Sequence, residues 1–162
     1  MLLKGIFIIP DGSPIPFQYN PEEINQERSV NYVKKEPLGM SHPVYHYRNG
    51  GGDELSFTMR VRDTLSIGGM KIPFSVDLYA GLLLDLTYPI RKQGIMISSP
   101  PEILFIFGTL IKKCKIAKVS VVKKEFSDLL IPVYGDISIT LFQVTNKNIN
   151  RKNSVKNLPG GF

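Results

Sequence analysis

The segment LSFTMRVR, residues Leu55–Arg62, alternates apolar and polar side chains at every position. Successive side chains of a β-strand point to opposite faces, so the pattern gathers the apolar groups on one face. It predicts a half-buried strand of an antiparallel sheet, with one face on a core and the other toward water. The apolar face holds Leu55, Phe57, Met59 and Val61, and the polar face holds Ser56, Thr58, Arg60 and Arg62.

A second alternating segment predicts a strand that is covered on both faces. Apolar residues at 137, 139 and 141 alternate with polar residues, but Phe142 and Val144 make the second face partly apolar as well. Because an apolar second face needs a covering surface, we expect Glu54–Arg62 and Ile137–Val144 to join a β-layer shared between copies of the chain. The candidate assembly residues are Leu55, Phe57, Met59, Ile139, Leu141, Phe142 and Val144.

Further β patterns are spread along the chain. Gly108 and Thr109 separate two of them and predict a hairpin turn. Three consecutive glycines within Asn49–Asp53 predict a mobile connection between strands. The additional predicted strands are Ile6–Ile9, Arg28–Lys35, Glu102–Phe107 and Ile111–Lys124.

One helix is expected, over Asp77–Thr87, with Ser75 or Asp77 as its cap and Pro89 closing it. The fold class is therefore mainly β, with two antiparallel sheets or a partly open β-barrel and one helix. A chain of 162 residues is the usual size of one domain. We expect a β domain over residues 1–145 and a flexible tail over 146–162, which is rich in Asn and Lys.

The sequence offers little for catalysis or for cofactor and metal binding. His42 and His46 have a ligand-like spacing, but Pro43 between them argues against the helix that would align them. Cys114 is the only cysteine and sits in a strand pattern, which favours a buried thiol over a nucleophile. We therefore expect no enzyme, no cofactor and no metal site. No apolar run approaches the ~20 residues that span a bilayer, so no membrane segment is expected.

The chain is basic, with a net charge of +6 and a pI of about 9.4. Lysines along strand edges discourage aggregation, which accounts for much of this charge. A β-barrel that binds nucleic acid through dibasic surface pairs is the alternative function, although the basic strand lacks interleaved aromatic residues. The dibasic pairs are Lys34-Lys35, Arg91-Lys92, Lys112-Lys113, Lys123-Lys124 and Arg151-Lys152.

Four short passages, in this order, resemble the tube-adaptor, or tube-initiator, baseplate proteins of contractile injection systems and contractile phage tails. They are FQYNPEEI from Phe17, with Tyr19, Asn20 and Pro21; LSFTM from Leu55; PPEILFIFG, with Pro100, Pro101 and Gly108; and the stretch from Phe126 through Pro132 to Leu141. The family's closing Gly-x-Pro order is altered here. Many members also carry a LysM module after this region, and residues 146–162 do not resemble one.

The resemblance implies a structural subunit of a baseplate hub, in the virion tail or injection particle. The single cysteine, Cys114, allows no disulfide within the chain, which fits synthesis in the bacterial cytoplasm. The subunit's partners would be copies of itself in a ring, with a hexamer expected, the tail tube protein, the spike or hub protein and neighbouring baseplate proteins. Nucleic acid would not be a partner, except for DNA that passes through the particle. Such a subunit needs complementary surfaces and no active site.

Overall fold

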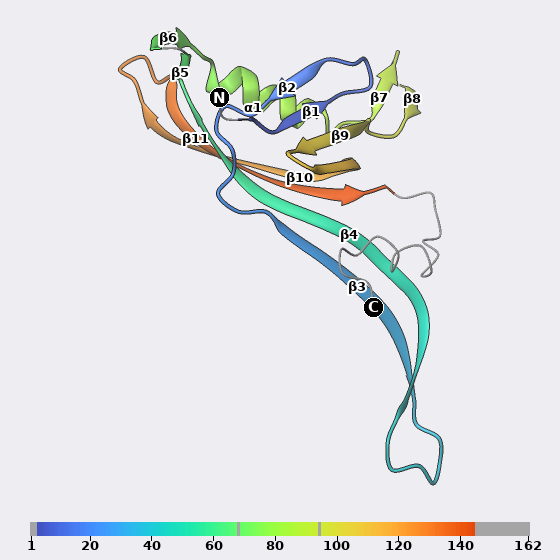
Figure 1. Ribbon diagram of the computed structural model, residues 1–162. Coiled ribbons are helices and arrows are strands. Elements are labelled where there is room, and N and C mark those ends of the chain that lie inside the picture. Colours follow the sequence, from blue (N-terminus) through green and yellow to red (C-terminus); the bar gives the residue numbers. More distant parts are fainter. Residues whose placement is uncertain (1–2, 68, 94, 145–162) are drawn as a thin grey trace.

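The computed structural model describes residues 3–67, 69–93 and 95–144, and the predicted C-terminal tail lies outside them. The fold is mainly β with one helix, as the sequence predicts (Figure 1). No helix in the described ranges is long and apolar enough to cross a membrane. The elements are β1 (Ile6–Ile8), β2 (Pro14–Pro16), β3 (Asn25–Lys35), β4 (Val44–Arg62), β5 (Thr64–Ile67), β6 (Met70–Pro73), α1 (Val76–Asp85), β7 (Ile90–Lys92), β8 (Ile95–Ser98), β9 (Glu102–Phe107), β10 (Leu110–Phe126) and β11 (Pro132–Gln143).

Seven strands form one antiparallel sheet in the order β2-β1-β9-β10-β11-β4-β3. The two alternating segments are neighbours, since Met59 of β4 pairs with Ile137 of β11 and Leu55 pairs with Leu141. Gly108 has a φ of 60° in the turn between β9 and β10, a conformation that glycine adopts without steric cost. The predicted hairpin at this position is therefore confirmed.

The seven-stranded sheet curls so that strands distant in its order face each other. Phe57 on β4 and Phe105 on β9 are separated by two intervening strands, yet their ring centroids lie 5.3 Å apart. The Phe7 ring on β1 packs at a tilt against both rings, with centroid distances of 6.2 Å to Phe57 and 5.6 Å to Phe105. The sheet does not close, because β2 and β3 remain at its edges. This aromatic cluster is the centre of the core.

Helix α1 covers the curled sheet at β10 and β11, and its side chains complete the core (Figure 1). Ser75 caps its first turn, accepting a hydrogen bond from the Leu78 N–H at 3.2 Å. The buried Tyr79 hydroxyl donates to the Pro16 carbonyl oxygen at 3.1 Å, which ties the helix to β2. At Gly135 an added Cβ would lie 3.0 Å from Val76, so the glycine lets the helix approach β11 closely.

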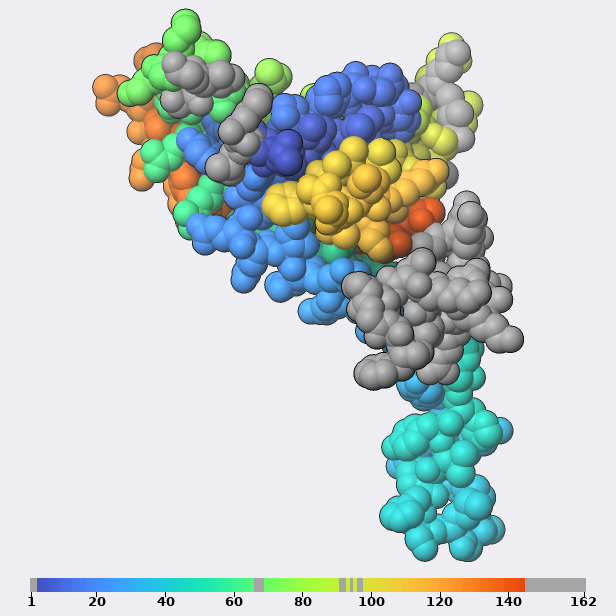
Figure 2. Space-filling view, in the orientation of Figure 1, coloured from blue at the N-terminus to red at the C-terminus, as the bar shows by residue number. Residues whose placement is uncertain are grey.

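Strands β3 and β4 continue beyond the body of the protein as a two-stranded hairpin (Figures 1 and 2). β11 pairs with β4 only as far as Glu54, so β4 from Val44 to Asp53 pairs with β3 alone. At ~3.3 Å per residue this extension is roughly 30 Å long. The predicted mobile connection at Asn49–Asp53 is wrong, because these residues lie inside β4.

Gly51 fits this position in β4 for a steric reason. A Cβ at Gly51 would collide with Ser29 of β3, where the register shifts at a bulge. Glycine at this point therefore allows a close backbone approach within the ladder, which is an established use of glycine in strands. The ribbons β5–β6 and β7–β8 were not predicted, because their strands are too short to display a period.

Candidate assembly interface

The first resembling passage builds the base of the hairpin. Phe17 is buried and packs edge-on against Phe7, with ring centroids 4.9 Å apart. The Asn20 side chain accepts from the Gly5 N–H at 2.9 Å and donates to the Leu3 carbonyl oxygen at 2.8 Å. Pro21 is buried beside it, whereas Tyr19 is exposed. Three of these four residues therefore hold the chain in place, and Tyr19 faces outward.

Gln18, which follows Phe17 in this passage, was not among the predicted motif residues, but it has a specific structural role. The Gln18 side chain is buried, donates to the Arg62 and Thr64 carbonyl oxygens at 2.9 Å and 3.1 Å, and accepts from the Arg62 N–H at 2.5 Å. The Gln18 amide thus makes the backbone hydrogen bonds that a neighbouring strand would make at the end of β4. A glutamine amide has both donor and acceptor groups, so it can pair with a strand edge as a peptide group does.

The remaining motif residues lie at strand ends. Pro100 and Pro101 precede β9 and are partly buried, which fits the extended backbone that proline imposes. Pro132 is buried as the first residue of β11. Phe126 is exposed at the end of β10. These positions shape the β9–β10–β11 meander and contain no catalytic group.

The predicted assembly residues divide into two groups. Leu55, Phe57, Met59, Ile139 and Leu141 are buried in the chain's own core, so their side chains present no surface to another copy. The sequence pattern placed them on one face correctly, but β1, β9 and α1 of the same chain cover that face. β11 also has neighbours on both edges and offers no edge for pairing.

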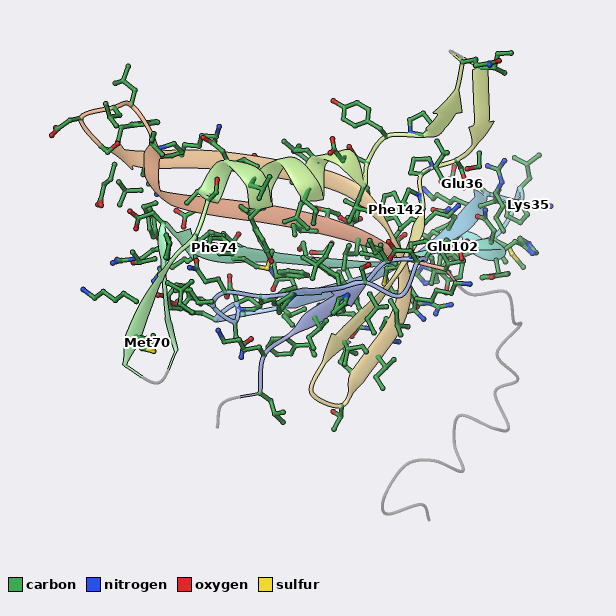
Figure 3. All side chains as sticks on the ribbon, turned by 90° about the horizontal axis from the view of Figure 1, so that it is seen from above. Lys35, Glu36, Met70, Phe74, Glu102 and Phe142 are labelled. Atoms are coloured by element: carbon green, nitrogen blue, oxygen red, sulfur yellow. The ribbon has the colours of Figure 1, made fainter. Side chains whose placement is uncertain are left out.

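Phe142 belongs to the opposite face and is 50% exposed. It lies between Glu54 of β4 and Lys115 of β10, and Lys115 in turn pairs with Glu102 of β9. Figure 3 shows Phe142 and Glu102 close together at this end of the sheet. Val144 is partly buried. The candidate interface therefore reduces to the outer face around Phe142.

The hairpin provides a larger exposed surface, which the sequence did not identify. None of the residues 28–53 is buried. Tyr32 and Tyr47 are cross-strand partners with ring centroids 6.3 Å apart, and Tyr45 lies on the same face two residues along β4. Their exposed fractions are 58%, 66% and 62% for Tyr32, Tyr47 and Tyr45. We call these three residues the tyrosine face.

A groove of about 650 Å³ lies on the polar face of β4 and β11, beside the chain that leads into β3. Thr58 and Ser138 share a hydrogen bond at 3.0 Å across it, and Arg60 forms an ion pair with Glu22 at 3.1 Å. The lining residues include no histidine that could activate these hydroxyls, and the carboxylates of Glu22 and Asp136 form ion pairs with Arg60 and Lys124. The groove therefore has the chemistry of a polar contact surface.

Asp136, also in this groove, has two hydrogen-bond donors. Lys124 donates to it at 2.7 Å and the Tyr134 hydroxyl at 2.9 Å. These donors stabilise the carboxylate and lower the pKa of Asp136. The Asp136 carboxylate in turn raises the pKa of Lys124. The charges in this part of the face are thus paired locally.

The candidate reactive groups are far apart. Cys114 is fully buried in β10, and burial raises the pKa of its thiol to about 11, so it is protonated at neutral pH. His42 and His46 lie at the tip and along the exposed part of the hairpin. Among residues 3–67, 69–93 and 95–144, no cluster of three or more His, Cys, Asp or Glu side chains could hold a metal ion.

Several of the dibasic lysines form ion pairs within the chain. Glu102 pairs with Lys113 at 2.8 Å and with Lys115 at 3.9 Å. Lys123 pairs with Asp77, and Lys34 pairs with Glu36. These ion pairs offset part of the positive charge that the dibasic pairs could present to phosphate, which weakens the support for the nucleic-acid alternative.

Comparison with known proteins adds one match. No curated protein matches the chain. Residues 9–152 match the family model described as contractile injection system tube protein. The matched range includes every strand of the seven-stranded sheet except β1, which precedes it.

Proposed function

Because the chain belongs to the contractile injection system tube protein family, a family of structural tail components, we propose that it forms or joins the ring that connects the spike hub to the tail tube. This placement in the baseplate is narrower than the family assignment. It is supported by the order of the four resembling passages and by the surfaces that the fold leaves uncovered.

The observation that carries the proposal is the uncovered hairpin. A two-stranded ribbon is marginally stable by itself in water, and here it also exposes three tyrosines and four other large apolar side chains. Tyrosine is enriched at protein interfaces, because it buries a large area with few rotatable bonds. A partner that covers the hairpin would bury this surface and stabilise the ribbon. The four apolar residues are Val30, Val33, Leu38 and Met40.

The open sheet supports assembly as well. β3 is an edge strand of 11 residues, and an unpaired edge of this length is a template for another chain. Proteins that function alone usually shorten or cover such an edge. We propose that copies of the chain, the tube protein and the spike protein cover β3, the tyrosine face and the surface around Phe142 in the particle. Six copies, as the resemblance implies, would close the ring.

The test is to locate the subunit in assembled particles. The chain would carry a small C-terminal tag and be produced with the spike, tube and sheath proteins of its own gene cluster. Electron microscopy of tag-labelled particles should place the label at one end of the tube, beside the spike. Label along the whole tube would identify a tube subunit and refute the adaptor position. A chain tagged identically but lacking residues 28–53 is the matched control, and it should be absent from particles.

A further inference from the structure

The chain carries two exposed apolar features at opposite ends (Figure 1). One is the tyrosine face of the β3–β4 hairpin. The other is the turn between β10 and β11, which we call the apolar turn, and its large side chains have no packing partner in the core. The apolar turn consists of Phe126, Leu129, Leu130 and Ile131.

The apolar turn is held in one shape by its own backbone. The Ser127 N–H donates to the Ile131 carbonyl oxygen at 2.9 Å, and the Leu130 N–H donates to the Ser127 carbonyl oxygen at 2.8 Å. Leu130 has a φ of 59°, in the left-handed region that leucine rarely adopts. Leu129 and Leu130 are each 81% exposed. A strained, hydrogen-bonded turn that presents two leucines to water is typical of a contact site.

The charges around the two features are opposite in sign. On the hairpin, Arg28 pairs with Asp53 and Lys34 with Glu36, while Lys35 and Arg48 form no ion pair within the described residues. Beside the apolar turn, Lys123 and Lys124 are paired with Asp77 and Asp136. Glu125 and Asp128 form no ion pair in the described part of the chain. Residues 28–53 thus carry four basic and two acidic side chains, whereas residues 125–131 carry two acidic side chains and no lysine or arginine.

We propose that the hairpin of one copy packs across the apolar turn of the next copy in the same ring. The tyrosine face would cover the leucines, and Lys35 and Arg48 would lie against Glu125 and Asp128 at the rim. This arrangement of an apolar centre and a charged rim is the usual anatomy of an interface. The proposal rests on the proposed ring-forming function and names the surfaces that would form the ring.

Size and symmetry agree with this assignment. The hairpin, residues 28–53, has 22 exposed residues, within the roughly 20–30 residues that each side of a standard interface contributes. Its extension of roughly 30 Å is long enough to reach past the edge of its own body. Because both halves of the contact lie on one chain at different places, the contact is heterologous, and repeating it closes a ring when each step is the same whole fraction of a full turn.

Charge reversal with rescue tests the contact. The hairpin variant carries Lys35→Glu and Arg48→Glu, the turn variant carries Glu125→Lys and Asp128→Lys, and the combined variant carries all four. Each single-surface variant places like charges together, and we expect ring incorporation to fall at least about tenfold. The combined variant restores opposite charges and should recover most of the incorporation. Lys118→Glu, which reverses an exposed charge outside both features, is the control and should assemble normally.

Cross-linking gives a second measurement that does not depend on charge. Chains with Tyr47→Cys mixed with chains with Leu129→Cys should form a disulfide-linked dimer in the assembled ring. Cys114 is buried and will not compete. Normal incorporation of both single-surface variants, or no recovery in the combined variant together with no cross-link, would overturn the contact.

The outcomes also separate this contact from the proposed function. If the tag lies beside the spike but charge reversal has no effect, the contact is wrong and the adaptor position stands. If charge rescue succeeds but the tag is spread along the tube, the contact stands and the adaptor position is wrong. Open filaments of the isolated chain, with no closed rings in particles, would refute contact within one ring.

Discussion

Substituting Gly51 by alanine should open the distal hairpin while the body of the protein remains folded. An added Cβ at Gly51 would meet the Ser29 hydroxyl and lie 2.8 Å from the Ser29 carbonyl oxygen. The hydroxyl can rotate away, but the carbonyl belongs to the β3 backbone, so the two strands must separate locally. Overpacking of this kind costs typically ~1–3 kcal/mol. A two-stranded ribbon has little stability to absorb such a cost.

Because 1–2 kcal/mol changes an equilibrium by roughly 5–30-fold, amide exchange in residues 28–53 should accelerate by about that factor in Gly51→Ala. The thermal unfolding midpoint should change little, since the core lies in another part of the fold. Gly52→Ala is the matched control, because nothing lies within 4 Å of the Cβ that it would add. Equal exchange in the two variants would refute the steric role of Gly51, and a large loss of global stability would refute the independence of the hairpin.

Three further outcomes are expected. Phe142→Asp should fold normally by circular dichroism, because Phe142 is 50% exposed, but its incorporation into particles should fall, whereas full incorporation would exclude this face from the interface. Below about pH 4 the protein should lose a small part of its stability, under roughly 1 kcal/mol, because hydrogen bonds from Lys124 and Tyr134 lower the folded-state pKa of Asp136. The stabilisation by these hydrogen bonds is present above the unfolded-state pKa of Asp136 and is lost as the pH falls through the folded-state pKa. In Asp136→Asn, the free energy of unfolding measured by chemical denaturation should therefore depend less on pH in this range. The same pH dependence in the variant and the original protein would count against the pairing. Thiol reagents should label Cys114 at neutral pH only as fast as the protein opens, and rapid labelling of the native chain would contradict its burial.

The sequence predicted the body of the fold because its strands alternate. Leu55–Arg62 has one apolar and one polar face, and that period survives in the structure as the pairing of β4 with β11. Gly108 was recognisable as a turn because it follows one apolar run and precedes another. Ser75 was identifiable as a cap by its position before the helical pattern.

One strand of the hairpin was predicted, since Arg28–Lys35 lies within β3, but the distal part of β4 was missed because its composition is unusual for a strand. Glycine is depleted in strands, so Gly50 to Gly52 favoured a loop, although a bulge opposite Ser29 requires a residue without a Cβ. The tyrosines at 45 and 47 do alternate, and together with Tyr32 they were the available signal. An apolar face on both sides of the glycines would have made the strand easier to recognise.

Five of the seven candidate assembly residues lie in the chain's own core, and the sequence could not reveal this for a different reason. Alternation shows which residues share a face, but it does not show whether the chain itself or a partner covers that face. The alternation therefore made Leu55 and Phe142 equally good candidates for a surface that another chain covers. Only the curl of the sheet, which brings Phe105 against Phe57, distinguishes the core face from the exposed one.

The continuity of β4 has a mechanical consequence. One strand of 19 residues runs from the distal hairpin into the core without an intervening loop. A force applied at the tip along the strand direction therefore reaches Leu55 and Met59 through backbone bonds and must shear many ladder hydrogen bonds together. A force applied across the ribbon would instead peel the same bonds one after another. The hairpin should be stiff along its length and compliant sideways, which suits a strut that holds neighbours at a fixed spacing while it allows them to tilt.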